Sequence, residues 1–277
     1  MRPFTASAPG KVMLAGGYAV LERPNPCFVL ATTARFRSTA EWAQAELPGA
    51  PSALPVTIVS PQYNQHNQYL LRLPDAESGG AFALLLHPAA PSEQRRNPYA
   101  EHTVAYAVAA AAAMRSPDAL TTLRAQCRAG VGLRLTLRAD NDFYSQKAQL
   151  ESRGLALTAA SLRGLPAHLP CVVGADGGAE VAKTGLGSSA AMITSVVGAV
   201  LGFLGAAALP AAGEARDVGS AGLAAVHGVA QLCHAAVQGK IGSGFDVCAA
   251  TSGSMPVRPF TVALRQLCLG FSQTYIS

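Results

Sequence analysis

Charged residues are scarce in this chain of 277 residues. Asp, Glu, Lys and Arg together make up 13% of it, against roughly 25% in an ordinary soluble domain. Half of the residues are hydrophobic, which excludes a disordered chain and supplies apolar surface for a large core. Lys and Arg outnumber Asp and Glu by 21 to 16, yet no basic run is longer than Arg95–Arg96. Since nucleic-acid binding usually needs a concentrated basic face, we expect no nucleic-acid partner; the modest basic excess suits a small anionic substrate.

Cysteine pairs of the metal-binding or disulfide type are also missing. The six cysteines lie far apart, none forms a C-x-x-C pair, and none has a histidine at zinc-site spacing. This spacing therefore indicates neither a structural zinc site nor a disulfide framework. We interpret the neighbours Cys233 and His234 as a buried thiol beside a partly exposed histidine. The first residues contain no apolar run of signal-peptide length, so we expect a reducing, cytoplasmic compartment.

One long segment, between Lys183 and Glu214, contains no charged residue. Its stretch 190–209 is long enough to cross a bilayer. It is rich in Ala and Gly, however, and lacks the Trp, Tyr, Lys and Arg anchors that mark membrane interfaces. We interpret it as a buried helix of a soluble domain, with no membrane partner; a membrane span is the weaker alternative.

Hydrophobic patterning places strands first and most helices later. Alternating and β-branched runs predict extended segments at 4–8, 11–15, 18–21, 27–33, 56–59, 69–73 and 131–139, with Pro9–Gly10 as a turn after the first. Helices are predicted from Asn97–Pro98 to Met114, within 190–209 and over 222–237. Regular βαβ alternation is absent, so we expect an α+β fold with helices packed on a mostly antiparallel or mixed sheet.

A glycine-rich turn precedes the longest helical run. It reads Thr184-Gly-Leu-Gly-Ser-Ser-Ala190, and its two glycines let the backbone approach a ligand closely. Backbone N–H groups at a helix N-terminus bind phosphate, and a Ser hydroxyl there can bind Mg²⁺. Taken alone, the segment could equally be an ordinary Gly-Ser turn that caps a helix.

Two further turns carry charge. Lys11 follows Pro9–Gly10, and Asp246 follows the glycine-interrupted turn 239–244. A lysine neutralises the charge of a transferring phosphoryl group, and a carboxylate beside it can accept a hydroxyl proton. Each alone has a simpler explanation, Lys11 as a surface cation and Asp246 as a turn residue or helix cap. Together the three turns suit phosphoryl transfer.

Three segments of the chain resemble, in their order, the motifs of the GHMP kinases, and most closely those of fungal-type phosphomevalonate kinases. The segments read SAPGKVMLAGGYAVL, KTGLGSSAAM and QGKIGSGFDVCAA. Gly16-Gly17-Tyr18 stands where mevalonate kinases and galactokinases have Gly-Glu-His. The resemblance runs from about Phe4 to Phe260. It implies a ribosomal protein S5 domain 2-like, ATP-binding N-terminal domain over residues 1–260. A divergent tail would follow over 261–277, with the family's C-terminal domain largely absent.

The resemblance also implies a reaction and a set of roles. ATP, with Mg²⁺, would phosphorylate 5-phosphomevalonate to 5-diphosphomevalonate in the mevalonate pathway. Lys11 and Asp246 would be the catalytic residues. The ATP phosphates would lie on the loop and helix start, with Ser189 near the metal; these residues are Gly185, Leu186, Gly187, Ser188, Ser189 and Ala190. Charge and position make Lys183, Lys240 and Arg138 candidates for binding the substrate, although a solvated surface role suits each of them equally well.

Three departures from the family pattern keep alternatives open. Ala182 replaces a common proline, and Ala235 stands where mevalonate kinases have a glutamate metal ligand. Because no carboxylate lies between Asp217 and Asp246, Mg²⁺ would depend on Ser189, water and the nucleotide. The family's third glycine-rich motif is not found. The alternatives are therefore an inactive or nucleotide-binding-only fragment, or another GHMP kinase such as mevalonate kinase.

We also expect an exposed apolar patch and poor solubility.

Overall fold

The computed structural model describes residues 1–22, 24–47, 52–74, 82–86, 95–114, 118–173, 179–211, 213–214, 217–240 and 242–257. The predicted tail 261–277 lies outside these ranges. The domain boundary expected at residue 260 therefore stays a prediction.

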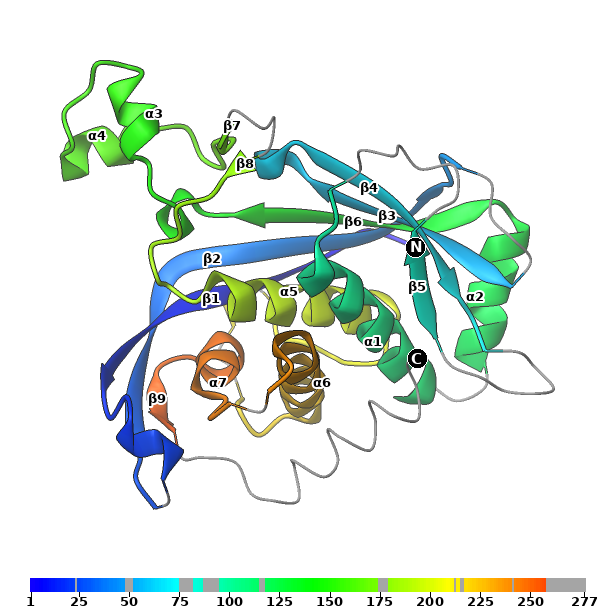
Figure 1. The fold of residues 1–277 in the computed structure, drawn as a ribbon. Coiled ribbons are helices and arrows are strands. Elements are labelled where there is room, and N and C mark those ends of the chain that lie inside the picture. Colours follow the sequence, from blue (N-terminus) through cyan, green and yellow to red (C-terminus); the bar gives the residue numbers. More distant parts are fainter. Residues whose placement is uncertain are drawn as a thin grey trace.

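A seven-stranded mixed sheet forms the centre of the fold (Figure 1). Its strands are β1 (Phe4–Ala15), β2 (Cys27–Gln44), β3 (Ala53–Ser60), β4 (Gln65–Arg72), β5 (Ala83–Leu86), β6 (Val131–Ala139) and β9 (Met255–Val257). The order is β1-β2-β6-β3-β4-β5, and β9 pairs with the start of β2. Only the β3–β6 pair is parallel; the other described pairs of this sheet are antiparallel. A separate short ribbon joins β7 (Val172–Val173) to β8 (Ala179–Glu180).

Four helices cover one face of this sheet, as Figure 1 shows. They are α1 (Pro98–Met114), α5 (Ser188–Phe203), α6 (Ala221–Gln238) and α7 (Phe245–Ser252). Helix α2 (Asp118–Arg128) packs against β3 and β6. The short helices α3 (Lys147–Glu151) and α4 (Ala159–Arg163) project beyond the end of β6. The expected α+β arrangement on a mixed sheet is confirmed.

Helix α5 is the central element of the core. Every residue from Ala190 to Leu201 is buried, because the helix lies between β1 and β2 on one side and α1 and α6 on the other. A helix that is apolar all round must be buried in this way. It ends at Phe203, earlier than the predicted run, and Gly205 follows in a left-handed conformation. Within the described residues, no helix is long and apolar enough to cross a membrane.

The predicted start of α1 is confirmed by its capping contacts. The side-chain oxygen of Asn97 accepts the Ala100 N–H at 3.2 Å, and the Glu101 carboxylate accepts the Asn97 N–H at 2.9 Å. This reciprocal pair satisfies two helix-start donors. Glu101 is buried but paired, since it also accepts hydrogen bonds from Arg96 at 2.5 Å and Tyr69 at 2.9 Å. Strand β6 likewise follows its predicted alternation.

Two local predictions are wrong. Pro9–Gly10 is not a turn: β1 runs straight through it, with a register shift against β2 between Pro9 and Lys11. Because β1 is an edge strand, the missing N–H of proline costs no ladder bond on its open side. Residues 18–21 do not extend the strand either. Gly16 ends it with a φ of +86°, and Ala19–Leu21 form a 3-10 turn.

An exposed apolar face is present, as expected. Val12 and Leu30 are register partners on β1 and β2, and Leu14 and Phe28 stand two residues away from them on the same face. All four side chains are between 43% and 68% exposed. This matches the expected patch, while poor solubility stays a prediction.

Two glycines of α6 give a matched test of this packing. A Cβ at Gly222 would lie 1.9 Å from the Ala208 carbonyl oxygen, whereas one at Gly228 would meet nothing within 4 Å. We expect Gly222→Ala to lower the free energy of unfolding by about 2 kcal/mol, because backbone must move. Gly228→Ala should raise it by up to ~1 kcal/mol through helix propensity. Urea unfolding of both variants measures this, and equal effects would contradict the packing described.

Candidate functional site

The glycine-rich turn ends at the N-terminus of α5. Gly185 and Gly187 have φ values of +85° and +73°, which favour glycine. The N–H of Ala191 donates to the Gly187 carbonyl at 3.2 Å, so the N–H groups of residues 188–190 precede the helix's own hydrogen bonds. Donors of this kind, together with the helix dipole, favour anion binding in general. Ser188 and Ser189 are half-buried, while Ala190 is buried and presents only its backbone.

Lys11 lies directly against this turn. Its backbone N–H donates to the Leu186 carbonyl at 2.7 Å, at the register shift of β1. Its Nζ lies 3.4 Å from the Gly185 carbonyl oxygen. The stem of the side chain passes so close to Gly187 that a Cβ there would lie 2.9 Å from Lys11 Cε. The structure therefore brings Lys11 and the glycine-rich turn together, as the motifs predicted.

The other end of the turn is held by the segment after β6. The Thr184 hydroxyl donates to the Asp142 carbonyl at 2.6 Å, and the Thr184 N–H donates to the Phe143 carbonyl at 3.1 Å. Phe143 is itself buried beneath Gly10. Sequence reasoning assigned no role to Thr184 or Phe143, because these contacts join segments about 40 residues apart.

Asp246 lies in the first turn of α7. One carboxylate oxygen accepts the Val247 N–H at 2.9 Å, and the other lies 3.4 Å from His234 Nε2. The neighbouring Phe245 ring lies beneath Lys11, with Nζ 5.5 Å from the ring centroid. Lys11 thus meets the start of α7 through this ring, and in the described part of the chain no ion pair joins Lys11 to Asp246. Sequence reasoning predicted a partly exposed His234, which is wrong: its side chain is buried, on the side of α6 that faces Asp246 of α7.

The three candidate substrate-binding cations differ in position. Lys183 is exposed, two residues before Gly185, and forms a bridge pair with Tyr144. Lys240 is exposed just after the left-handed C-cap Gly239 of α6. Among the described residues, no hydrogen bond or ion pair is made by the charged side-chain group of any of the three cations. Arg138 alternates with buried residues of β6 and so lies on the sheet face away from α5.

A cavity of ≈ 580 Å³ adjoins the turn at Thr184. Its walls come from the end of β6, from α3 and α4, and from the segment around His168. Burial raises the pKa of the Tyr144 phenol to about 12, so this wall residue is a neutral hydroxyl. Leu157 and Leu162 give the lining of the cavity an apolar part, and Asp140 gives it a polar part.

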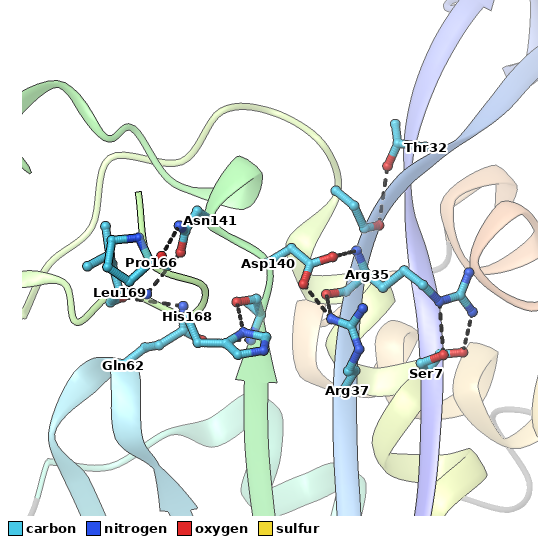
Figure 2. Close-up of polar contacts among 12 residues, drawn as sticks. Ser7, Thr32, Arg35, Arg37, Gln62, Asp140, Asn141, Pro166, His168 and Leu169 are labelled. Atoms are coloured by element: carbon cyan, nitrogen blue, oxygen red, sulfur yellow. Dashed lines mark hydrogen bonds and ion pairs between the residues drawn. The ribbon is translucent and has the colours of Figure 1, made fainter. Parts of the chain in front are cut away.

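Polar contacts at the end of β6 fix the walls of this cavity (Figure 2). The Asp140 carboxylate accepts the Arg35 N–H at 2.8 Å and pairs with the Arg37 guanidinium. Asn141 donates to the Pro166 carbonyl at 2.8 Å, and the ring of His168 contacts the Ala139 carbonyl at 2.9 Å. The long segment between β6 and the turn is thereby tied to the sheet at its start, through Asp140, and near its middle, through His168.

A metal site made by protein ligands alone is not found here. Among the described residues, no group of three or more His, Cys, Asp and Glu side chains could hold a metal ion. The Ser189 hydroxyl, half-buried at the start of α5, remains a hard oxygen ligand of the type that Mg²⁺ prefers. A nucleotide-bound Mg²⁺ needs only one or two such protein oxygens, so Ser189 fits this use.

Comparison with known proteins identifies the relatives of the chain. The peroxisomal phosphomevalonate kinase of Arabidopsis thaliana is 41% identical over 260 residues, which cover 90% of this chain and 49% of that protein. A phosphomevalonate kinase of Gibberella zeae is 33% identical over 264 residues, covering 94% and 52%. The chain is a homologue of phosphomevalonate kinases. The resemblance inferred from the three motifs is confirmed.

The homology covers part of each relative. The chain spans about half the length of the curated phosphomevalonate kinases it matches. No protein-family model matches it. Among solved structures, the Lin0012 protein of Listeria innocua aligns with a TM-score of 0.52 at 18% identity, covering 98% of this chain and 52% of that one. This alignment shows a shared fold.

The contact between Lys11 and Gly187 can be tested with inorganic tripolyphosphate. We expect Gly187→Ala to weaken its binding about tenfold or more, because a side chain there is strained and displaces Lys11. The matched control is Gly228→Ala in α6, outside the three motifs, since a Cβ at Gly228 meets nothing within 4 Å. Titration calorimetry measures both, and unchanged affinity in Gly187→Ala would contradict the anion site.

Proposed function

We propose that the chain is a kinase acting in the mevalonate pathway. It transfers the γ-phosphoryl group of ATP to 5-phosphomevalonate, and the products are ADP and 5-diphosphomevalonate. The observation that carries the proposal is the seating of Lys11 against the glycine-rich turn at the start of α5, in a homologue of phosphomevalonate kinases. Residues 1–260 would form an ATP-binding domain of the ribosomal protein S5 domain 2-like type.

The turn and the helix start bind the ATP phosphates. Backbone N–H groups of residues 185–190 and the α5 dipole stabilise negative charge without any acidic or basic side chain. Lys11 adds a positive charge beside them, where the γ-phosphoryl group develops charge as it transfers. Ser189 would hold the Mg²⁺ that, when bound, neutralises the phosphate oxygens.

Asp246 has a positional role in this proposal. The acceptor oxygen belongs to a phosphate monoester, which is already acidic, so a strong base is hardly needed. That oxygen forms the new bond to the γ-phosphorus while the bond to the bridging oxygen of ADP breaks. Asp246 then orients the acceptor and the neighbouring cations rather than removing a tightly held proton.

The cavity beside Thr184 suits the nucleoside. It begins where the phosphate-binding turn begins, and its ≈ 580 Å³ lie within the usual size of a small-molecule site. Leu157 and Leu162 offer an apolar surface for a base, and Asp140 and Asn141 offer polar groups for a ribose. Lys183 and Lys240 are the cations best placed for the anionic groups of 5-phosphomevalonate. Arg138, on the other face of the sheet, stays a prediction.

Two rival functions can be distinguished from the proposed one by experiment, and the cellular location can be established in the same way. A nucleotide-binding-only protein would bind ATP without turnover, and a mevalonate kinase would prefer the acceptor that lacks a phosphate. A cytoplasmic location stays a prediction, since the name of the Arabidopsis relative places that protein in the peroxisome. No observation favours a nucleic-acid or membrane partner.

Acceptor preference tests the proposed reaction. We expect ADP release from ATP and Mg²⁺ to depend on 5-phosphomevalonate, and kcat/KM for mevalonate to be at least about 100-fold lower, because mevalonate lacks the phosphate group that the proposed cations would bind. A coupled ADP assay measures this. Faster turnover of mevalonate would overturn the substrate assignment. Thermal stabilisation by ATP without turnover would identify the binding-only alternative.

Removal of the Lys11 charge tests the catalytic centre. We expect Lys11→Met to lower kcat about 100-fold or more, because a positive charge at the transferring group is lost. The matched control is Arg128→Met, an exposed cation at the last residue of α2, a helix that packs against β3 and β6. It removes a charge of the same sign and should leave kcat unchanged. Equal losses in both variants would indicate a general charge effect and contradict the assignment.

A further inference from the structure

His234 is a buried titratable residue that the proposed reaction does not use. It lies on the last turns of α6, and its side chain is 7% exposed. Its Nε2 atom is 3.4 Å from Asp246 Oδ2 and 2.8 Å from the amide nitrogen of Gln238. Gln238 is four residues further along the same helix, so the two side chains share one face. The buried ring of His234 therefore reaches from α6 toward the Asp246 carboxylate of α7.

The protonation of Nε2 follows from its two neighbours. A carboxylate can only accept a hydrogen bond, so an unprotonated Nε2 would put two acceptors side by side. A proton on Nε2 removes this conflict, because Nε2 lies within ion-pair distance of the charged carboxylate, at 3.4 Å, while the atom nearest to it belongs to Gln238. The Gln238 amide can then present its oxygen to the same N–H by a half-turn.

Both oxygens of the Asp246 carboxylate are then restrained. Oδ1 accepts the Val247 N–H at 2.9 Å, and Oδ2 faces the His234 ring. The carboxylate is 21% exposed, so it keeps an accessible side although both oxygens have partners. Its orientation depends on α6, which is rigidly packed against α1 and α5.

We propose that His234 is a positioning residue for Asp246. Through an Nε2–H donor it holds the carboxylate in one rotamer, with its open side toward the acceptor, and Gln238 holds the ring. This inference rests on the role proposed above for Asp246. A misplaced carboxylate lowers the rate even when nucleotide binding is intact, since small displacements of an orienting group can cost about 100-fold.

The position of the ring proton tests the contact without any activity. Long-range ¹H–¹⁵N spectra of the full chain report which ring nitrogen of each histidine is protonated, and His234→Gln assigns the signals of His234. We expect the Nε2–H form for His234 in the parent chain, and a loss of this preference in Asp246→Ala. A parent His234 found in the Nδ1–H form would overturn the proposal.

A double-mutant cycle separates positioning from general stability. We expect His234→Leu to lower kcat about tenfold or more with the KM for ATP unchanged, and His234→Gln to recover most of the loss through its N–H donor. In an Asp246→Asn background, His234→Leu should add little, because the two residues act as a unit. Additive losses would overturn the positioning role.

The control lies on the same helix. His227 is seven residues from His234 and half-buried, and His227→Leu should leave kcat unchanged; an equal loss there would overturn the specific role of His234. A parent chain with no turnover would refute the proposed function, while the ring-proton measurement would still decide the His234–Asp246 contact.

Discussion

The contact between β1 and the turn before α5 is the constraint on which the rest of the site depends. The Lys11 N–H is bonded to the Leu186 carbonyl at 2.7 Å, and this approach leaves no room for a side chain at the glycine that adjoins each partner. A Cβ at Gly10 would lie 2.8 Å from the Leu186 oxygen, and one at Gly187 would lie 2.9 Å from Lys11 Cε. Glycine is therefore needed on both sides of the contact, at positions far apart in the sequence.

This contact also explains how so weakly charged a chain would bind the polyanion of the proposed function. The positive end of α5 and its open N–H groups are provided by backbone, and the helix that carries them is apolar and buried. Its packing between the sheet and α6 fixes where the donors lie. An anion site of this kind costs the core little, because only the Lys11 side chain brings charge into it. Low charge content and phosphate binding are thus compatible.

Much of the fold could be predicted from the sequence wherever the pattern is local. Helix α1 follows its Asn97 cap, β6 follows strict alternation, and α5 follows its uncharged run. The errors arise where the position of a segment in the fold determines its local conformation. Pro9–Gly10 has the composition of a turn, and only its place on an edge strand lets β1 continue through it.

The same limit applies to the site. Motif residues could be chosen from the sequence because glycine, lysine and aspartate suit one chemistry, and the turn and Lys11 do meet. His234 could not be found in this way. Its partner Asp246 comes from the next helix, after left-handed glycines at 239 and 244 reverse the chain, and periodicity within α6 does not reveal what the neighbouring helix presents. Thr184 was missed for the same reason, because its acceptor belongs to the segment after β6.

The choice of cation supports the view that the three motifs form one site. The chain has four lysines, at positions 11, 147, 183 and 240, and all its other basic side chains apart from histidine are arginine. Three of the four lysines lie within the three motifs. Arginine binds a carboxylate or phosphate through a planar, fixed pair of donors, whereas lysine is a compact charge on a flexible stem. A cationic side chain that must stay close to a phosphoryl group as it moves from donor to acceptor benefits from the flexible stem of lysine. Lysine is thus concentrated where mobile charge is useful, while arginines such as Arg37 and Arg96 form fixed structural pairs with Asp140 and Glu101.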